Sequence, residues 1–181
     1  MVSSSASEAS TTRPTVAAVA GAVRQVAKLG VAMLTVHAAG GRAMLEAAVT
    51  AAAEVDTPPM LLGVTVLTSL DDADLAEIGV DSALGEQALR LGRLAVSAGV
   101  GGLVCSPFEI APLRHALGSA PRVVVPGIRP AYAGDDQKRV MGPAEALALG
   151  ADILVIGRPI TRAPVPAEAA AGIAHKLRPA A

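Results

Sequence analysis

Two arginines stand directly after apolar runs of the sequence and close to glycine. Arg129 follows the run RVVVP within the segment PGIRP, and Arg158 follows Gly157 at the end of the run DILVIG. A guanidinium can hold an oxyanion with two hydrogen bonds, and a glycine lets backbone approach a ligand closely. Either arginine alone could equally be a solvated surface charge. The pair predicts an anion site, provided that both runs are neighbouring strands whose carboxyl ends meet.

Other polar residues also follow apolar runs. Thr68 comes directly after LLGVTVL, where its hydroxyl could contact a ligand, although Thr68 and Ser69 could instead cap the next helix. Gln137 lies in the polar stretch GDDQKRV and is a candidate ligand-facing amide. His37 ends another run, but a single histidine without Cys, Asp or Glu at metal-binding spacing is more often structural. We therefore assign His37 no role and expect no metal site.

The elements that must position these residues alternate regularly along the chain. Apolar runs predict strands at 31–37, 61–67, 102–105, 122–126 and 152–157. Helical patterns occupy about 15–29, 41–54, 71–78, 83–98, 109–117, 143–149 and 166–177. Strands that are apolar throughout indicate burial on both faces, and helical connections indicate a parallel sheet. The predicted class is α/β, and no glycine-rich dinucleotide fingerprint or P-loop opens any helix.

Composition excludes several classes of function. The chain has 181 residues, a formal net charge of -1 and 1% aromatic residues. It therefore has neither the excess of basic residues that binds phosphate backbones nor the aromatic side chains on which bases stack, so we expect no nucleic-acid binding. Its apolar runs are interrupted well short of the roughly 20 residues needed to cross a bilayer, and its first residues do not show the basic-then-apolar pattern typical of a signal peptide. We expect a cytoplasmic protein that binds neither nucleic acid nor membrane.

The remaining expectations concern the N-terminus and the single cysteine. Residues 1–13 are rich in Ser and Thr without apolar periodicity, which predicts a disordered leader before one domain over 14–181. Cys105 lies in an apolar run, so we expect a buried, unreactive thiol.

From about residue 14 to the C-terminus the sequence resembles the bacterial-type orotidine 5'-phosphate decarboxylases. The stretches that carry the resemblance, in this order, are MLTVHAAGGRAML, LLGVTVLTSL, GLVCSP, VVVPGIRP, GDDQKRVMGPAEALALGAD and LVIGRPITRA. The resemblance implies a parallel β/α barrel of the TIM type. It also implies a homodimer that converts orotidine monophosphate to uridine monophosphate and carbon dioxide in pyrimidine biosynthesis, without a metal or organic cofactor.

The resemblance also assigns ligand contacts, residue by residue. It places Thr68 against the pyrimidine nucleotide and brings Arg129 and Gln137 to its phosphate. Gly157 and Arg158 would complete the phosphate cradle. These residues bind the ligand, and none of them is assigned a catalytic role.

The chain departs from the family pattern where the family carries its catalytic Lys and Asp network. A motif of the form D-x-K-x-x-D-I-P-N-T is absent, because none of Lys28, Lys138 and Lys176 has an acid at both required positions. Thr15 stands where the last residue of that motif would fall, and it is carried over as a substrate contact on that basis alone. The resemblance therefore implies a decarboxylase whose catalytic residues are not present in this chain.

The number of strands leads to the same expectation. A closed barrel of this type has about eight strands, and the sequence offers five. Five parallel strands would leave two unpaired edges, so we expect either that the natural protein continues upstream or that another chain closes the sheet. Two functional hypotheses follow: an orotidine 5'-phosphate decarboxylase, or a non-catalytic nucleotide-phosphate-binding or assembly module. Another phosphate-binding barrel enzyme would need its own strand-end Lys or Asp, and none is seen.

Overall fold

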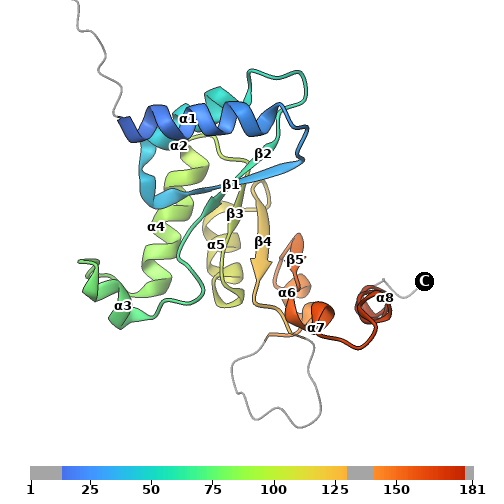
Figure 1. The fold of residues 1–181 in the computed structure, drawn as a ribbon. Helices are drawn as coiled ribbons and strands as arrows, with labels where there is room; N and C mark the ends of the chain where they lie inside the picture. Colours follow the sequence, from blue (N-terminus) through green and yellow to red (C-terminus); the bar gives the residue numbers. More distant parts are fainter. Residues whose placement is uncertain (1–13, 130–140, 178–181) are drawn as a thin grey trace, which may run out of the picture.

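The computed structural model describes residues 14–129 and 141–177, and within them the predicted strands form one parallel sheet (Figure 1). The strands lie in chain order, each hydrogen-bonded to the next. They are β1 (Met33–His37), β2 (Met60–Val64), β3 (Gly102–Val104), β4 (Arg122–Pro126) and β5 (Ile153–Val155). The class and the parallel pairing are as predicted. Strand β4 has the predicted bounds, and the other four strands are shorter than the apolar runs that indicated them. The predicted leader, residues 1–13, lies outside the described residues.

Helices separate the strands, as the periodicity indicated. Their bounds are α1 (Pro14–Ala27), α2 (Arg42–Ala52), α3 (Asp72–Glu77), α4 (Leu84–Ser97), α5 (Ile110–Leu117), α6 (Pro143–Ala148), α7 (Arg158–Thr161) and α8 (Pro166–Lys176), with short 3₁₀ turns η1 (Ala38–Gly40) and η2 (Pro107–Glu109). Helix α7 was not predicted, because its four residues are too few to show a 3.6-residue period. Arg158, which lies outside the predicted helices, is therefore the first residue of a helix.

The core lies between the sheet and the helices that cover one of its faces. Its fully buried side chains include Leu45 of α2, Leu103 of β3, and Val123 and Val125 of β4. The absence of a side chain at Gly92 lets α4 pack closely on α5 and on β3, since a Cβ atom there would lie 2.7 Å from Leu113 Cδ2 and 3.2 Å from Leu103 Cδ1. Close packing on this face fixes the sheet that carries the strand-end residues.

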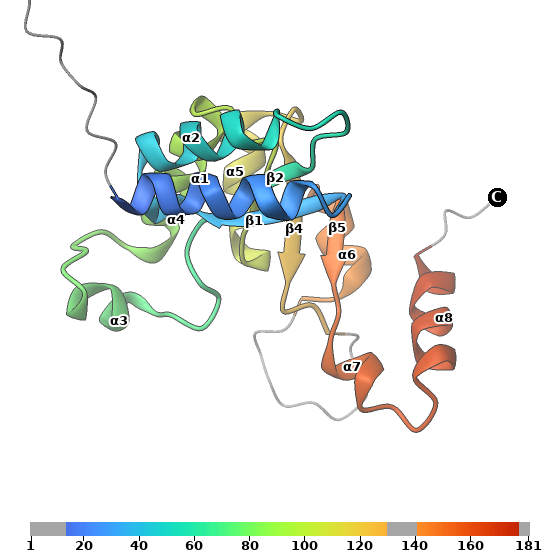
Figure 2. The same cartoon turned by 45° about the horizontal axis from the view of Figure 1, so that its top comes forward.

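The prediction that all strands are buried on both faces is wrong for the two outer strands. Met33 of β1 is 41% exposed and Val155 of β5 is 49% exposed. The physical reason is that β1 and β5 each pair with only one neighbour in the described part of the chain. Helix α8 contributes no buried residue; it lies on the α7 side of the molecule, away from α1 and α2 (Figure 2).

An ionic network fixes the amino end of β5 against β4. Arg114 donates from Nε to the carbonyl of Gly150 at 2.9 Å and pairs with Asp152, which also accepts from the Val123 N–H at 2.7 Å. Burial opposes ionisation of Asp152, but the hydrogen bonds from Val123 and from the neighbouring arginines outweigh it and lower the pKa of the carboxyl. Because this network lies at the opposite strand ends from Arg129 and Arg158, we interpret it as structural.

No described helix is long and apolar enough to span a membrane.

Candidate functional site at the carboxyl ends of the strands

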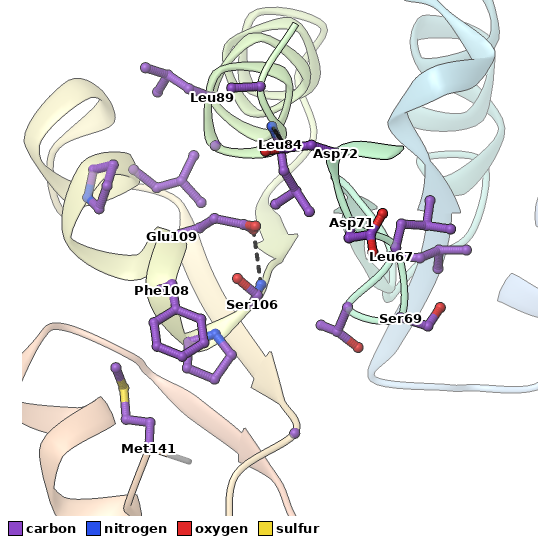
Figure 3. A pocket seen from close by; sticks show the side chains of 18 of the residues that line it. Leu67, Ser69, Asp71, Asp72, Leu84, Leu89, Ser106, Phe108, Glu109 and Met141 are labelled. Atoms are coloured by element: carbon purple, nitrogen blue, oxygen red, sulfur yellow. Dashed lines mark hydrogen bonds between the residues drawn. The ribbon is translucent and has the colours of Figure 1, made fainter. Parts of the chain in front are cut away.

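A pocket of about 1060 Å³ opens at the carboxyl ends of β2 to β5 (Figure 3). Its walls are formed by residues within the segments 67–72, 83–89, 106–113 and 127–129, together with Met141 and Arg158. Ligands of parallel α/β folds bind beyond this edge of the sheet. The pocket is therefore the candidate site.

Three of the residues predicted from the sequence line this pocket: Thr68, Arg129 and Arg158. They follow β2, β4 and β5, so only the parallel sheet brings them together. Arg129 is half-buried, and its backbone N–H donates to the Met141 carbonyl at 3.4 Å. Arg158 is exposed at the start of α7. Among the residues described, neither guanidinium forms an ion pair, so two positive charges border one cavity.

The alternative capping role considered for Thr68 and Ser69 is wrong. Asp71 caps α3 instead, because its side chain accepts from the backbone N–H groups of Ala73 and Asp74 at 2.9 and 3.0 Å. Thr68 and Ser69 lie exposed in the preceding turn, and within the described ranges their hydroxyls have no hydrogen-bond partner. Both hydroxyls are therefore available to a ligand in the pocket.

The other predicted contacts are placed differently. Gly157 directly precedes Arg158 and is exposed. Thr15 lies in α1 and lines a separate cavity of about 290 Å³ with residues 40–44, so the structure does not bring it to the arginines. Gln137 lies outside the described residues.

Glu109 is a pocket residue that the sequence reasoning missed. It is only 4% exposed, and its Oε2 accepts the backbone N–H of Ser106 at 3.0 Å. Its Oε1 is buried without a hydrogen-bond partner among the described residues. Burial raises the pKa of this carboxyl, against the opposing effect of the Ser106 hydrogen bonds. The signal in the sequence was SPFE, which fits the S-x-x-E capping box.

Replacing Glu109 by glutamine should leave the fold intact and reduce the pH dependence of its stability. The amide oxygen can still accept from Ser106, while the cost of burying a charge disappears. Because the folded pKa is raised, the stabilisation that Glu109 contributes is complete below its unfolded pKa and is lost as pH rises through the folded value. Urea unfolding of Glu109→Gln from pH 4 to 8 should therefore show a smaller decrease in unfolding free energy than the parent.

The matched control is Glu86→Gln, which neutralises an exposed glutamate of the same pocket. It should retain the pH dependence of the parent. A Glu109→Gln profile that parallels the parent's would show that Glu109 is already equally ionised in the folded and unfolded states.

The remaining titratable candidates do not contribute to the site. Cys105 is buried, and burial raises the pKa of its thiol to about 12, in agreement with the expected inert cysteine. His37 is exposed at the end of β1, outside the pocket lining. Within residues 14–129 and 141–177, no three His, Cys, Asp or Glu side chains are grouped so that they could hold a metal ion.

Comparison with known proteins extends over most of the chain. The family model described as "Orotidine 5'-phosphate decarboxylase / HUMPS family" matches residues 15–173. The orotidine 5'-phosphate decarboxylase of Neisseria gonorrhoeae (strain NCCP11945) is 55% identical over 150 residues, which are 82% of this chain and 61% of the relative. That of Opitutus terrae is 54% identical over 161 residues, 88% of this chain and 70% of the relative. The chain thus spans about 61% of the length of the Neisseria relative.

Solved structures give the same result. Orotidine 5'-phosphate decarboxylase from Lactobacillus acidophilus is similar with a TM-score of 0.79 and 34% identity over 90% of this chain and 70% of that one. An uncharacterized conserved protein from Geobacillus kaustophilus has a TM-score of 0.76 and 32% identity over 90% of this chain and 71% of its own. The five parallel strands therefore belong to a β/α fold of the TIM-barrel type.

Proposed function

The chain belongs to the orotidine 5'-phosphate decarboxylase / HUMPS family, and from this we propose that it serves the decarboxylation of orotidine monophosphate to uridine monophosphate in pyrimidine biosynthesis. The observation that carries the proposal is that Thr68, Arg129 and Arg158, which follow three different strands, line one pocket. Two guanidinium groups bordering one cavity suit a doubly charged phosphate. The chain then supplies the phosphate-binding side of the substrate site.

Within this site each polar residue has a distinct role. Arg129 and Arg158 hold the phosphate by charge-assisted hydrogen bonds, and Gly157 leaves space for the ligand beside Arg158, since nothing lies within 4 Å of where its Cβ would be. Thr68 donates or accepts through its hydroxyl along the nucleotide. Gln137 adds an amide contact to the phosphate. Thr15 lines a separate pocket of this chain, and its contact with a substrate rests on the family resemblance alone.

These residues bind and orient the substrate, but they do not perform the proton transfer. Decarboxylation leaves a carbanion that an acid must protonate, and the lysines of this sequence, Lys28, Lys138 and Lys176, lie in no D-x-K-x-x-D arrangement. Binding without turnover by this chain is the corresponding expectation. Binding without turnover is also what the second candidate function, a nucleotide-phosphate-binding module without catalysis, would show.

We further propose that the protein is a cytoplasmic homodimer that needs no metal or organic cofactor. The family resemblance is the support for this proposal. Strand β1 pairs only with β2 among the described strands, and its Met33 is exposed. Its other edge is therefore able to pair with another strand. Sedimentation velocity at micromolar concentration measures the oligomeric state directly.

The proposed function is tested by comparing two ligands that differ only in the phosphate. Calorimetry should show that uridine monophosphate binds to the chain and that uridine binds at least about tenfold more weakly, since charge-assisted hydrogen bonds contribute roughly 1.5–3 kcal/mol. Equal affinity for the two ligands would contradict a phosphate site. Raising the salt concentration should weaken uridine monophosphate binding and leave uridine binding unchanged, because the exposed arginine is screened.

A further inference from the structure

We propose that Phe108 is a specificity-determining residue, an aromatic wall against which the ring of the bound nucleotide packs. This inference rests on the proposed function and deepens it, because it explains how a phosphate pocket would prefer a nucleotide to a plain sugar phosphate. Phe108 lies on the wall of the pocket that Arg129 and Arg158 also line. Among residues 14–129 and 141–177, it is the only aromatic residue that lines the pocket.

The exposure of Phe108 is informative because of where it occurs. The residue is the only phenylalanine of the chain and is 62% exposed. A single exposed apolar side chain is common on protein surfaces and needs no explanation by itself. Here, however, the exposed ring borders a cavity that also presents Leu67 and Met141. Apolar walls with a few convergent polar groups are typical of small-molecule sites.

The turn that carries Phe108 is held by contacts of its neighbours, so the backbone that presents the ring is in place before a ligand binds. Pro107 and the capping box between Ser106 and Glu109 fix the 3₁₀ turn η2. Pro107 and Glu109 are themselves buried. Figure 3 shows the Glu109 carboxyl directed toward the Ser106 nitrogen, whereas the Phe108 ring extends from the turn on the side of Met141. A preorganised wall loses little entropy on binding.

The chemistry of the pocket then defines the ligand class. The two arginines require an anion, and the flat face of Phe108 favours a planar ring, so the matching ligand carries both. A nucleoside monophosphate has this combination, whereas ribose 5-phosphate has the anion alone. Stacking of a base on an aromatic side chain is sequence-tolerant and strengthens binding by roughly ten- to a hundredfold. Phe108 should therefore increase affinity for the nucleotide and leave affinity for the sugar phosphate unchanged.

The experiment measures the affinities of uridine monophosphate and ribose 5-phosphate for the parent chain and for Phe108→Ala. The expected result is a loss of about tenfold in uridine monophosphate affinity, with less than a twofold change for ribose 5-phosphate. Phe108→Tyr should retain the affinity of the parent because it keeps the ring, and Phe108→Leu should lose most of it. Circular dichroism and the melting temperature monitor folding, which an exposed side chain should hardly affect.

Ile78→Ala is the matched control, because Ile78 is a similarly exposed apolar residue that does not line the pocket. It should change neither affinity. Equal losses for both ligands in Phe108→Ala, or a parent that binds the two ligands equally well, would overturn the inference. So would a change in sedimentation coefficient without a change in selectivity, since the ring would then contact a second copy of the chain. The proposed function fails separately, if uridine monophosphate binds no better than uridine.

Discussion

Decarboxylation of orotidine monophosphate by this chain is expected to be at least roughly a hundredfold slower than by an enzyme with a complete proton-donating network. The reason is that positioned acid–base groups contribute on the order of 10²–10⁴ in rate, and no lysine of this sequence lies between acids in a D-x-K-x-x-D run. An absorbance assay of orotidine monophosphate follows the reaction directly. The orotidine 5'-phosphate decarboxylase of Lactobacillus acidophilus, a structural relative, is a suitable positive control.

Binding must be measured on the same preparation, because an unfolded chain would also fail to react. Weak but measurable binding of uridine monophosphate, together with negligible turnover, is the expected combination. Turnover close to that of the control enzyme would show that the required acid lies elsewhere in this sequence and that the role assigned to the D-x-K-x-x-D motif is wrong.

Replacing Arg158 by alanine is expected to lower the affinity for uridine monophosphate by about ten- to a hundredfold. The substitution removes a guanidinium that can hold the phosphate with two charge-assisted hydrogen bonds, and such bonds contribute roughly 1.5–3 kcal/mol. Arg158 is exposed at the start of α7, a helix without buried residues, so the fold should remain. Calorimetric titration with circular dichroism as the folding control measures both effects.

Two further variants separate a specific contact from a general loss of charge. Arg162→Ala removes an exposed arginine directly after α7 that does not line the pocket, and it should leave the affinity nearly unchanged. Arg158→Lys keeps the charge but loses the planar fork, so an intermediate affinity is expected. If Arg158→Ala binds as tightly as the parent with its fold intact, Arg158 is a solvated surface charge rather than a phosphate ligand.

Much of the candidate site could be predicted from the sequence because its signals are local. Both PGIRP and GRPIT show an arginine that follows an apolar run close to glycine. Because the carboxyl ends of parallel strands lie at the same edge of the sheet, the two arginines can be expected at one site. The hydroxyl of Thr68 was found in the same way. Glu109 was missed, although SPFE contains a capping-box pattern, because the sequence does not reveal that its second carboxyl oxygen is buried without a partner among the described residues.

The role of Asp71 illustrates why local signals are insufficient. Thr68, Ser69 and Asp71 are all residues that cap helices well, and the sequence could not decide among them. The backbone of the turn places the Asp71 carboxylate on the N–H groups of Ala73 and Asp74. The two hydroxyls are thereby left to the pocket rather than to the helix.

The sequence by itself determined the α/β class, the number of the strands and their places along the chain, and which strand ends carry arginine. These features depend on apolar runs and turn residues, whose physics is local. Only the tertiary structure decided that Thr15 and Arg158 lie at different pockets, that Met33 and Val155 stay exposed, and that Phe108 lines the same pocket as Arg158. The pocket that a residue lines and the exposure of its side chain depend on contacts between residues far apart in the chain. Such contacts produce no periodic pattern in a single sequence.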